Sequence, residues 1–224
     1  LLLWYGKNRR ILPWREENTP YRVWVSEIML QQTRVEAVKP YFSRFMEELP
    51  GIRALACVEE ERLLKLWEGL GYYTRARNLK KAAKILTDKY DGEMPASYKD
   101  ILSLPGIGSY TAGAVASIAF GIPEPAVDGN VLRVMTRIFA DSEDITRPAV
   151  KKKYEGLLRT ALLDISSAGP ETSEILQKQF PVHTLPGNYN QAWIELGALI
   201  CIPSGRPLCE ECPLESLCLS KKEG

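Results

Sequence analysis

The cysteines near the C-terminal end place the strongest constraint on how this chain folds. Four of the five cysteines, Cys201, Cys209, Cys212 and Cys218, lie within the last 24 residues and are separated by seven, two and five residues. Four thiolates in one short segment can close around a zinc ion or an iron-sulfur cluster, and the ligation then fixes the loops between them. A disulfide framework is the alternative, but a chain of this size has little need of one.

The rest of the chain repeats apolar residues at helical spacing. One example is the run Val131, Leu132, Val134, Met135 and Ile138, whereas few stretches alternate with period two. The pattern predicts an all-α fold. The longest irregular stretch, residues 166–190, contains two Pro-Gly combinations and is interpreted as a linker or surface insertion before the cysteines.

Composition limits the class of protein without identifying a partner. The chain is 45% hydrophobic and 25% charged, as in globular proteins, and its formal net charge of +1 gives no bulk signal for nucleic acid. Residues 101–123 are uncharged, but prolines and glycines interrupt them, and the first residues lack the features of a signal peptide. We therefore expect an intracellular protein that is not membrane-bound, in which Cys57 is a buried core residue.

The sequence Leu-Pro-Gly-Ile-Gly at 104–108 precedes a helix of small residues at 111–120. Two glycines let the backbone turn tightly, and the free amides at the start of the next helix can bind an anion such as a DNA phosphate. An ordinary turn between two helices is an equally good interpretation of these five residues alone.

Two carboxylates are candidates for chemistry. Glu27 lies in an apolar segment, 21–33, that predicts a buried helix. Burial raises the pKa of a carboxyl group, which is how a general acid is made, although a structural salt bridge to Arg15, Arg22 or Arg34 is the alternative. Asp128 precedes an amphipathic helix, where it is expected to be an N-cap whose amide donors keep it ionised.

Five strings in one order resemble a known family: Leu-Pro-Trp-Arg at 12–15, Val-Ser-Glu-Ile-Met-Leu-Gln-Gln-Thr at 25–33, Trp-Glu-Gly-Leu-Gly-Tyr-Tyr at 67–73, the 104–108 string, and Val-Asp-Gly-Asn at 127–130. The chain from Trp4 to Cys218 resembles the MutY-type adenine DNA glycosylases of the endonuclease III superfamily. This implies a six-helix barrel domain with a helix-hairpin-helix over residues 18–127. Residues 1–17 and 128–224 would form an iron-sulfur cluster domain, with the active site in the cleft between the domains.

The resemblance also implies roles for individual residues. Glu27 would protonate a mispaired adenine, and Asp128 would face the cationic sugar, with Tyr110 and Asn130 orienting that carboxylate. Residues matched to adenine or DNA contacts are Arg10, Arg15 and Gln191 at the flipped base, Gln32 and Tyr72 in the base stack, and Leu104, Gly106 and Gly108 in the hairpin. Cys201, Cys209, Cys212 and Cys218 would hold a four-iron four-sulfur (4Fe-4S) cluster, although the first loop is one residue longer than in the family.

Two features favour a particular member of that superfamily. Relatives that also cut the DNA strand carry a Lys where this chain has Tyr110, so a glycosylase that removes only the base is implied. Thymine-mismatch relatives lack the buried Glu, so Glu27 favours adenine opposite 8-oxoguanine or guanine. The expected partner is duplex DNA, bound by a monomer, and the family's C-terminal reader of 8-oxoguanine lies outside residues 1–224.

Competing interpretations remain at this stage. A thymine or oxidised-pyrimidine glycosylase of the same fold differs in the base released, and a non-catalytic DNA-binding or electron-transfer module would leave Glu27 unexplained. A group of basic residues is interpreted either as a phosphate-facing stripe or as a solvated helix face: Arg75, Arg77, Lys80, Lys81 and Lys84.

Overall fold

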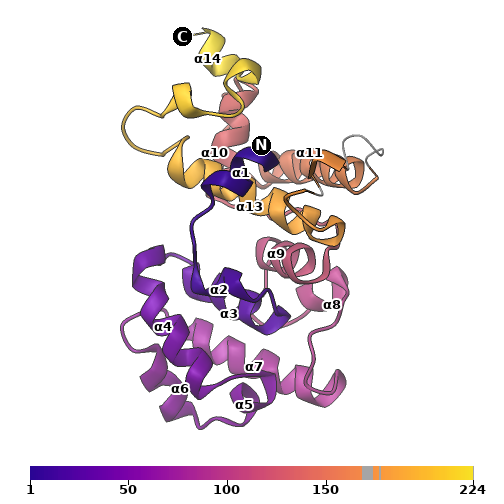
Figure 1. Cartoon of the computed structure of the whole chain (residues 1–224). Helices are drawn as coiled ribbons and strands as arrows, with labels where there is room; N and C mark the ends of the chain where they lie inside the picture. The colour runs from indigo at the N-terminus through magenta and orange to yellow at the C-terminus, as the bar shows by residue number, and fades with distance from the viewer. Residues whose placement is uncertain (168–173, 177, 224) are drawn as a thin grey trace. The chain divides into compact units, whose positions relative to one another are not determined.

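The structure is a computed structural model that describes all residues except 168–173, 177 and 224. Its described residues form helices and turns without a strand, which confirms the all-α fold class. They divide into two compact units (Figure 1). We call Ile11–Phe120 the hairpin unit, and Leu1–Arg10 together with Gly121–Gly224 the cysteine unit. The sequence predicted a barrel domain over residues 18–127. The hairpin unit covers residues 11–120, so each of its boundaries lies seven residues earlier than expected.

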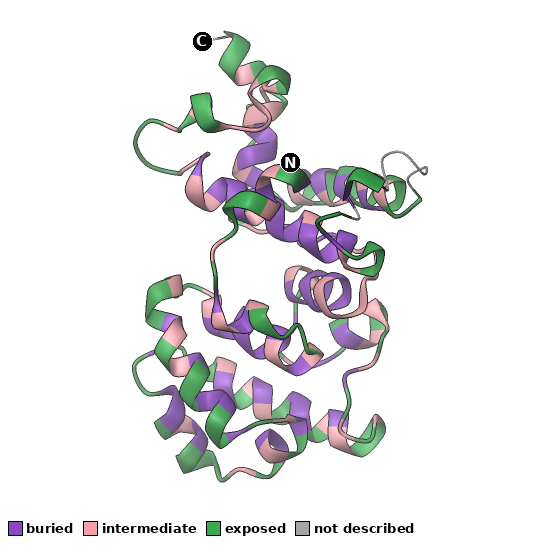
Figure 2. Ribbon diagram, viewed as in Figure 1, coloured by how far each residue is buried: buried purple, intermediate pink, exposed green. Residues whose placement is uncertain are grey.

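The hairpin unit is built around one buried helix, α3. Its helices are α2 (Pro13–Glu16), α3 (Pro20–Leu30), α4 (Val35–Glu48), α5 (Ile52–Cys57), α6 (Glu60–Trp67), α7 (Thr74–Lys89), α8 (Tyr98–Leu102) and α9 (Ser109–Phe120). The Thr19 side chain caps α3, and Pro20 occupies its first turn, where proline is tolerated. Because α3 packs against α2, α4, α7 and α9, it is enclosed within the unit (Figure 2).

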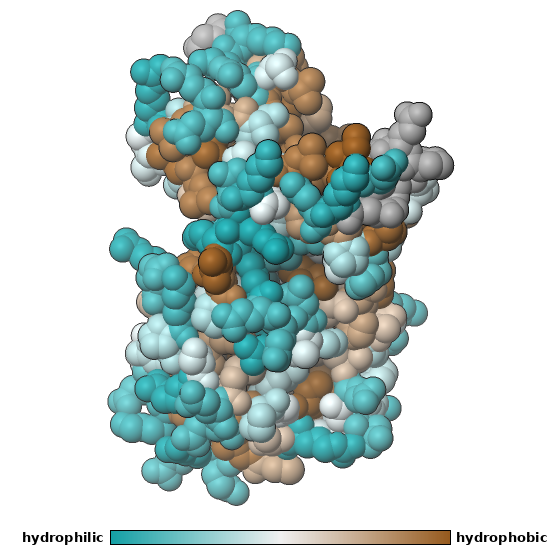
Figure 3. All heavy atoms as spheres, viewed as in Figure 1, coloured by the Kyte–Doolittle hydropathy of each residue, from teal (hydrophilic) through white to brown (hydrophobic). Residues whose placement is uncertain are grey.

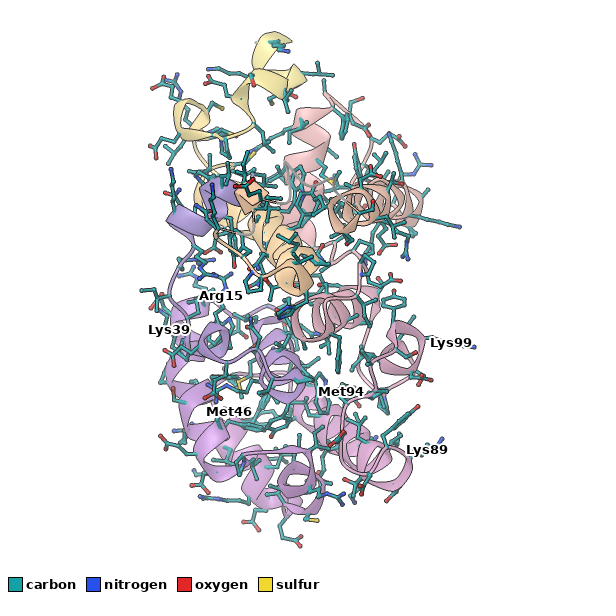
Figure 4. All side chains as sticks on the ribbon, turned by 45° about the vertical axis from the view of Figure 1, so that its right-hand side comes forward. Arg15, Lys39, Met46, Lys89, Met94 and Lys99 are labelled. Atoms are coloured by element: carbon teal, nitrogen blue, oxygen red, sulfur yellow. The ribbon has the colours of Figure 1, made fainter. Side chains whose placement is uncertain are left out.

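Side chains of the hairpin unit separate into a core and a charged surface. Met46 and Met94 are buried, whereas Lys89 and Lys99 are exposed (Figure 4). Hydrophilic residues dominate much of the visible face of this unit in the space-filling view (Figure 3). The small residues of α9, seven of which are buried, let this helix lie close to α3. The predicted helix of small residues is therefore confirmed.

The cysteine unit is built around α13. Its elements are α1 (Leu2–Asn8), α10 (Gly129–Ile138), α11 (Pro148–Ser166), the 3-10 turn η1 (Val182–Thr184), α13 (Leu185–Leu199), the 3-10 turns η2 (Cys209–Glu211) and η3 (Glu215–Leu217), and α14 (Leu219–Glu223). Helix α13 contacts α1, α10, α11 and η1. Apolar residues of α10, α11 and α13 form its main core, so the two ends of the chain meet on one helix.

Two expectations from the sequence are wrong. The expected linker or surface insertion at 166–190 is wrong in its bounds, because Ser166 still belongs to α11 and residues 185–190 already belong to α13. Pro186 lies in the first turn of α13, where its missing amide hydrogen bond is not needed. Cys57 is exposed, since it ends α5 on the side opposite Ile52, Leu55 and Ala56. Residues 168–173 and 177 of the expected linker lie outside the described part of the chain.

Within the described residues, none of the helices combines the length and the apolar character needed to cross a bilayer. The uncharged stretch 101–123 contains α9, which is only 12 residues long.

The contact between α10 and α13 generates a prediction about stability. A Cβ atom added at Gly197 would lie 2.7 Å from the Cβ of Asn130 and 3.0 Å from its carbonyl oxygen. Gly197→Ala should therefore destabilise the fold by about 1–3 kcal/mol through overpacking. Gly156→Ala is the matched control, because this helical glycine is exposed with nothing within 4 Å, and it should stabilise α11 by up to about 1 kcal/mol. Urea unfolding of both variants measures the two shifts, and equal shifts would contradict the packing argument.

Candidate functional site

Glu27 is enclosed by the most buried stretch of the hairpin unit. Every residue from 23 to 29 in α3 is buried, and Glu27 itself is 8% exposed. Arg22, one of the arginines considered as its partner, instead lies 3.9 Å from Glu17 and donates to the Pro13 carbonyl at 3.1 Å. Apolar surroundings favour the neutral form of a carboxyl group in general, and a neutral carboxyl can donate a proton.

The 104–108 sequence forms the expected turn between two packed helices, α8 and α9. Leu104 is buried, and Gly106 has a φ of 79°, a conformation that disfavours other residues. A Cβ at Gly106 would also lie 2.7 Å from the Cβ of Asn78. Gly108 is exposed and directly precedes α9, which has no acidic residue in its first turn. A helix start without acidic residues is a general binding site for an anion.

Tyr110 and Arg15 are both half-buried in the hairpin unit. Tyr110 lies in the first turn of α9, one residue after Ser109, and Arg15 lies on the short helix α2 (Figure 4).

Two further candidates of the hairpin unit, Gln32 and Tyr72, share an unusual backbone conformation. Their φ angles are 57° and 46°, a region that residues other than glycine rarely adopt. Both side chains are exposed, and Tyr72 is 66% exposed, so Tyr72 is not a core residue. Two polar or aromatic side chains held outward on strained backbone are typical of a contact surface.

The predicted basic stripe on α7 is only partly present. Arg77 pairs with Glu60, and the Arg75 guanidinium donates to main-chain carbonyls of the hairpin unit. Lys81 and Lys84 are exposed and Lys80 is half-buried. The interpretation of Arg75 as a phosphate-facing residue is therefore not supported, because its donors are used within the fold.

Asp128 caps α10, as predicted. Its Oδ1 accepts the Val131 amide at 2.9 Å, and its Oδ2 accepts a hydrogen bond from the Asn130 side chain at 2.8 Å. Asn190 of α13 fixes the approach to this cap by accepting the Ala126 amide and donating to the Glu124 carbonyl. The two donors thus fix the directions of both carboxylate oxygens of Asp128.

Arg133, which the sequence analysis missed, connects this cap to the first cysteine. Its guanidinium donates to the Asn130 side-chain oxygen at 2.9 Å, to the Gly197 carbonyl at 2.8 Å and to the Cys201 carbonyl at 2.9 Å. Burial lowers the pKa of Arg133, while negative charge on Cys201 and Asp128 raises it. The chain of contacts from Asp128 through Asn130 and Arg133 ends at Cys201.

Arg10 is held by a carboxylate that was also missed. Glu195 is fully buried and accepts the Arg10 backbone amide, its Nε and its Nη2 at 2.7–3.0 Å. Gln191, 7% exposed, lies one turn earlier on α13 and therefore on the same face. The structure thus brings the two candidate adenine-binding residues of the cysteine unit to one helix face. The signal was available, since Glu195 is a carboxylate inside an apolar helical pattern, as Glu27 is.

The four clustered cysteines lie on the turns that follow α13. Cys201 follows its last turn, Cys209 and Cys212 flank η2, and Cys218 follows η3. A hydrogen bond from the Leu208 amide to the Ile200 carbonyl closes the longer first loop. Arg137 donates to the Cys201 sulfur at 3.2 Å, and the Cys218 thiol donates to the Arg137 carbonyl.

The donor set fits a thiolate-ligated group, although the thiols are not closed around one ion. In the described part of the chain, no three His, Cys, Asp or Glu side chains are grouped as ligands of one metal ion. Burial raises the pKa of the Cys212 thiol, and the charges of Cys201, Cys218 and Cys209 raise it further. Nearby positive charge favours the thiolate form that a ligand needs, and a cluster of iron ions would supply such charge.

Residues 25–160 match the family described as "HhH-GPD superfamily base excision DNA repair protein". The chain is 42% identical over 98% of its length to the adenine DNA glycosylase of Buchnera aphidicola subsp. Baizongia pistaciae, and 40% identical over 99% of its length to that of Homo sapiens. It spans 57% of the Buchnera protein and 39% of the human protein.

Solved structures agree with this similarity. A thermostable thymine-DNA glycosylase superposes with a TM-score of 0.80 at 27% identity, covering the whole of this chain and 94% of that one. A non-covalent complex of endonuclease III with DNA superposes with a TM-score of 0.69 at 25% identity, covering 99% of this chain and 92% of that one.

The Arg133 contacts generate a prediction about the cysteine unit. Arg133→Met keeps a long side chain but has no N–H groups to donate. The carbonyls of Gly197 and Cys201 and the side-chain oxygen of Asn130 therefore lose their hydrogen-bond donor. We expect a loss of about 2–4 kcal/mol in the free energy of unfolding, because acceptors of these helices lose their partners. Denaturant unfolding checks this, with the exposed Lys152→Met on α11 as the control. Equal stability of the two variants would show that the Arg133 contacts are dispensable.

Proposed function

Because the chain belongs to the HhH-GPD superfamily of base excision DNA repair proteins, we propose that it hydrolyses the N-glycosidic bond of adenine mispaired with 8-oxoguanine or guanine. The match over residues 25–160 confirms the family inferred from the motifs. The observation that carries the choice of adenine is Glu27, a carboxyl group enclosed in an apolar helix. Relatives of 37–42% identity that are named adenine DNA glycosylases support it.

Glu27 supplies the proton that the leaving base needs. Adenine leaves poorly as an anion, and protonation of a ring nitrogen turns it into a neutral leaving group. The bond is out of reach inside a duplex, so the adenine must first be flipped out of the base stack. A carboxyl group kept from water delivers its proton to the base instead of exchanging it with solvent.

Asp128 stabilises the positive charge that develops on the sugar. The Val131 amide and the Asn130 side chain hold its two oxygens in fixed directions, so no reorganisation is needed as the cation forms. The carboxylate acts as electrostatic partner or transient nucleophile before water completes the hydrolysis. Tyr110 is assigned, with Asn130, to orienting this carboxylate.

Other candidates bind the DNA. Arg10, Arg15 and Gln191 line the site of the flipped adenine, and Gln32 and Tyr72 insert beside the opposite base. The hairpin of Leu104, Gly106 and Gly108 contacts a phosphate through backbone amides. The partner is duplex DNA with an adenine mispair, bound inside the cell by a single copy of the chain.

The reaction stops at the abasic site. Strand cleavage by this superfamily uses a Lys amine that forms a Schiff base, and the matching position here is Tyr110. Removal of mispaired thymine is the second candidate function, favoured by the TM-score of 0.80 with the thymine-DNA glycosylase. The base released from otherwise identical duplexes distinguishes the two.

Cys201, Cys209, Cys212 and Cys218 hold a 4Fe-4S cluster in this proposal. When bound, the cluster joins the turns around η2 and η3 to the end of α13 through iron-sulfur bonds. Arg137, whose guanidinium contacts the sulfur of Cys201, then lies beside the negative charge of the thiolates.

Glu27→Gln should abolish adenine release and leave mismatch binding within about tenfold of the parent chain. The amide keeps the shape of the side chain but has no proton to give. General acid help is worth about a hundred- to ten-thousandfold, and adenine's poor leaving ability places this case at the upper end. Single-turnover cleavage of adenine opposite 8-oxoguanine, guanine or thymine, followed by alkali, measures the rate.

The exposed Glu61→Gln on α6 serves as the control and should cleave like the parent chain. If Glu27→Gln released adenine at close to the parental rate, Glu27 would be a structural carboxylate and not the proton donor. If the parent chain released thymine and not adenine, the second candidate function would stand.

Iron content provides an independent prediction. The purified chain should be brown and contain about four iron atoms, as four cysteine thiolates hold in a cubane cluster. Cys209→Ser should lose most of this iron. Cys57→Ser, which changes an exposed cysteine of the hairpin unit, should keep it. Colourless folded protein with one stoichiometric zinc would show that the four thiolates bind zinc instead.

A further inference from the structure

Arg75 makes the densest set of side-chain hydrogen bonds described in the hairpin unit. Its Nη1 donates to the carbonyls of Ile28 at 2.9 Å, Met29 at 3.1 Å and Gln31 at 2.5 Å, all at the end of α3. Its Nη2 donates to the carbonyls of Leu70 at 2.8 Å and Gly71 at 3.2 Å. One guanidinium therefore joins two loops that are about forty residues apart in the sequence.

Aromatic rings hold the same guanidinium. It lies 5.4 Å from the ring centroid of Trp67 and 5.6 Å from that of Tyr72. Trp67 is fully buried and Tyr72 is mostly exposed, so the guanidinium lies at the boundary between the core and the surface. Cation-π attraction adds to the hydrogen bonds in fixing its position.

The two loops that Arg75 joins each carry a strained residue. Arg75 binds the carbonyl of Gln31, which directly precedes Gln32, and the carbonyl of Gly71, which directly precedes Tyr72. Gln32 and Tyr72 both have left-handed φ angles, 57° and 46°. Backbone in this region persists only where surrounding contacts hold it, and Arg75 supplies such contacts on both sides.

We propose that Arg75 is a positioning residue that holds Gln32 and Tyr72 in the outward conformation in which they enter the DNA base stack. This inference rests on the proposed function of those two residues. Arg75 itself touches no DNA in this role, since its donors are turned to the protein main chain. The side chain thus sets how rigidly two DNA-contacting residues are presented, and by that route it affects affinity for the mispair.

Arginine is the residue type that this position requires. Five N–H donors in a planar fork reach carbonyls on two loops at once, while a lysine ammonium has three donors at one point. Burial lowers the pKa of Arg75, yet a guanidinium stays charged at neutral pH. Arg75→Lys is therefore a sharp test, because it keeps the charge and removes the fork.

The first measurement needs no DNA. The Thr33 amide bonds to the Leu30 carbonyl in one loop, and the Leu70 amide bonds to the Trp67 carbonyl in the other. In Arg75→Lys, hydrogen exchange at both amides should be at least about tenfold faster, since both loops open more often. Exchange at the Tyr90 amide, at the far end of α7, should not change. Arg62→Lys is the control, because Arg62 is an exposed arginine of α6 that pairs with Glu48 of α4. It should leave hydrogen exchange at all three amides unchanged.

The second measurement is affinity for a duplex with adenine opposite 8-oxoguanine, compared in two backgrounds. Arg75→Lys should weaken binding about tenfold in the parent chain, and less than about twofold where Gln32→Ala and Tyr72→Ala are already present. A role confined to the stability of the unit would give equal losses in both backgrounds. Equal losses would overturn the proposal, as would unchanged exchange at Thr33 and Leu70.

A further variant keeps the test decisive if Arg75→Lys does not fold. Tyr72→Leu removes the ring over the guanidinium at an exposed position and should accelerate exchange at Thr33, on the other loop, through Arg75. Unchanged exchange at Thr33 in that variant would overturn the proposal. The exchange measurements stand even if the parent chain releases no adenine, so failure of the proposed function is recognised separately.

Discussion

The hydrogen bonds of Arg133 connect the elements on which the cysteine unit depends. The guanidinium donates to the carbonyl of Gly197 on α13 and to the carbonyl of Cys201. It also donates to the side-chain oxygen of Asn130 and so orients this residue beside the Asp128 cap. Because Gly197 has no side chain, α13 lies close to α10 at Asn130. This close approach brings Arg133 within reach of all three acceptors. A change in the turn after α13 therefore acts on the orientation of Asp128 through two hydrogen-bonded residues.

The hairpin unit meets a different requirement. In the proposed function, it keeps Glu27 away from water while presenting exposed residues to DNA. The burial of α3 satisfies the first need, and the loops at its end and after α6 satisfy the second. Both depend on the packing of α9 and α7 against α3, so the acid and the contact loops are parts of one packed assembly.

Local signals in the sequence predicted local structure well. The Asp128 cap is confirmed, as are the all-α fold and the helix of small residues after Gly108, because each depends on neighbours within a few residues. The C-terminal bound of the expected linker at 166–190 was wrong, since the Pro-Gly pair at 186–187, which favours a turn, also fits the first turn of a buried helix.

The binding partners of Arg75, Arg133 and Glu195 could not be assigned in the same way, although the apolar pattern around Glu195 did indicate a buried carboxylate. Arg75 binds carbonyls more than forty residues away, and Glu195 binds Arg10, 185 residues away. Main-chain carbonyls carry no signature in the sequence, so the acceptors of an arginine cannot be read from residue types. Such contacts are determined by tertiary packing alone.

The cysteine unit consists of two segments that are separated in the sequence by the whole hairpin unit. This has a consequence for folding during synthesis on the ribosome. A ribosome delivers the hairpin unit as one continuous segment, which can close its core as soon as Phe120 has emerged. Residues 1–10 are made before the hairpin unit, yet Glu195 of α13, which binds Arg10, lies 185 residues further along the chain. Leu2 and Tyr5, which are buried in the folded unit, therefore stay uncovered while the hairpin unit is already folded. Closure of the cysteine unit thus has to wait for the synthesis of α13.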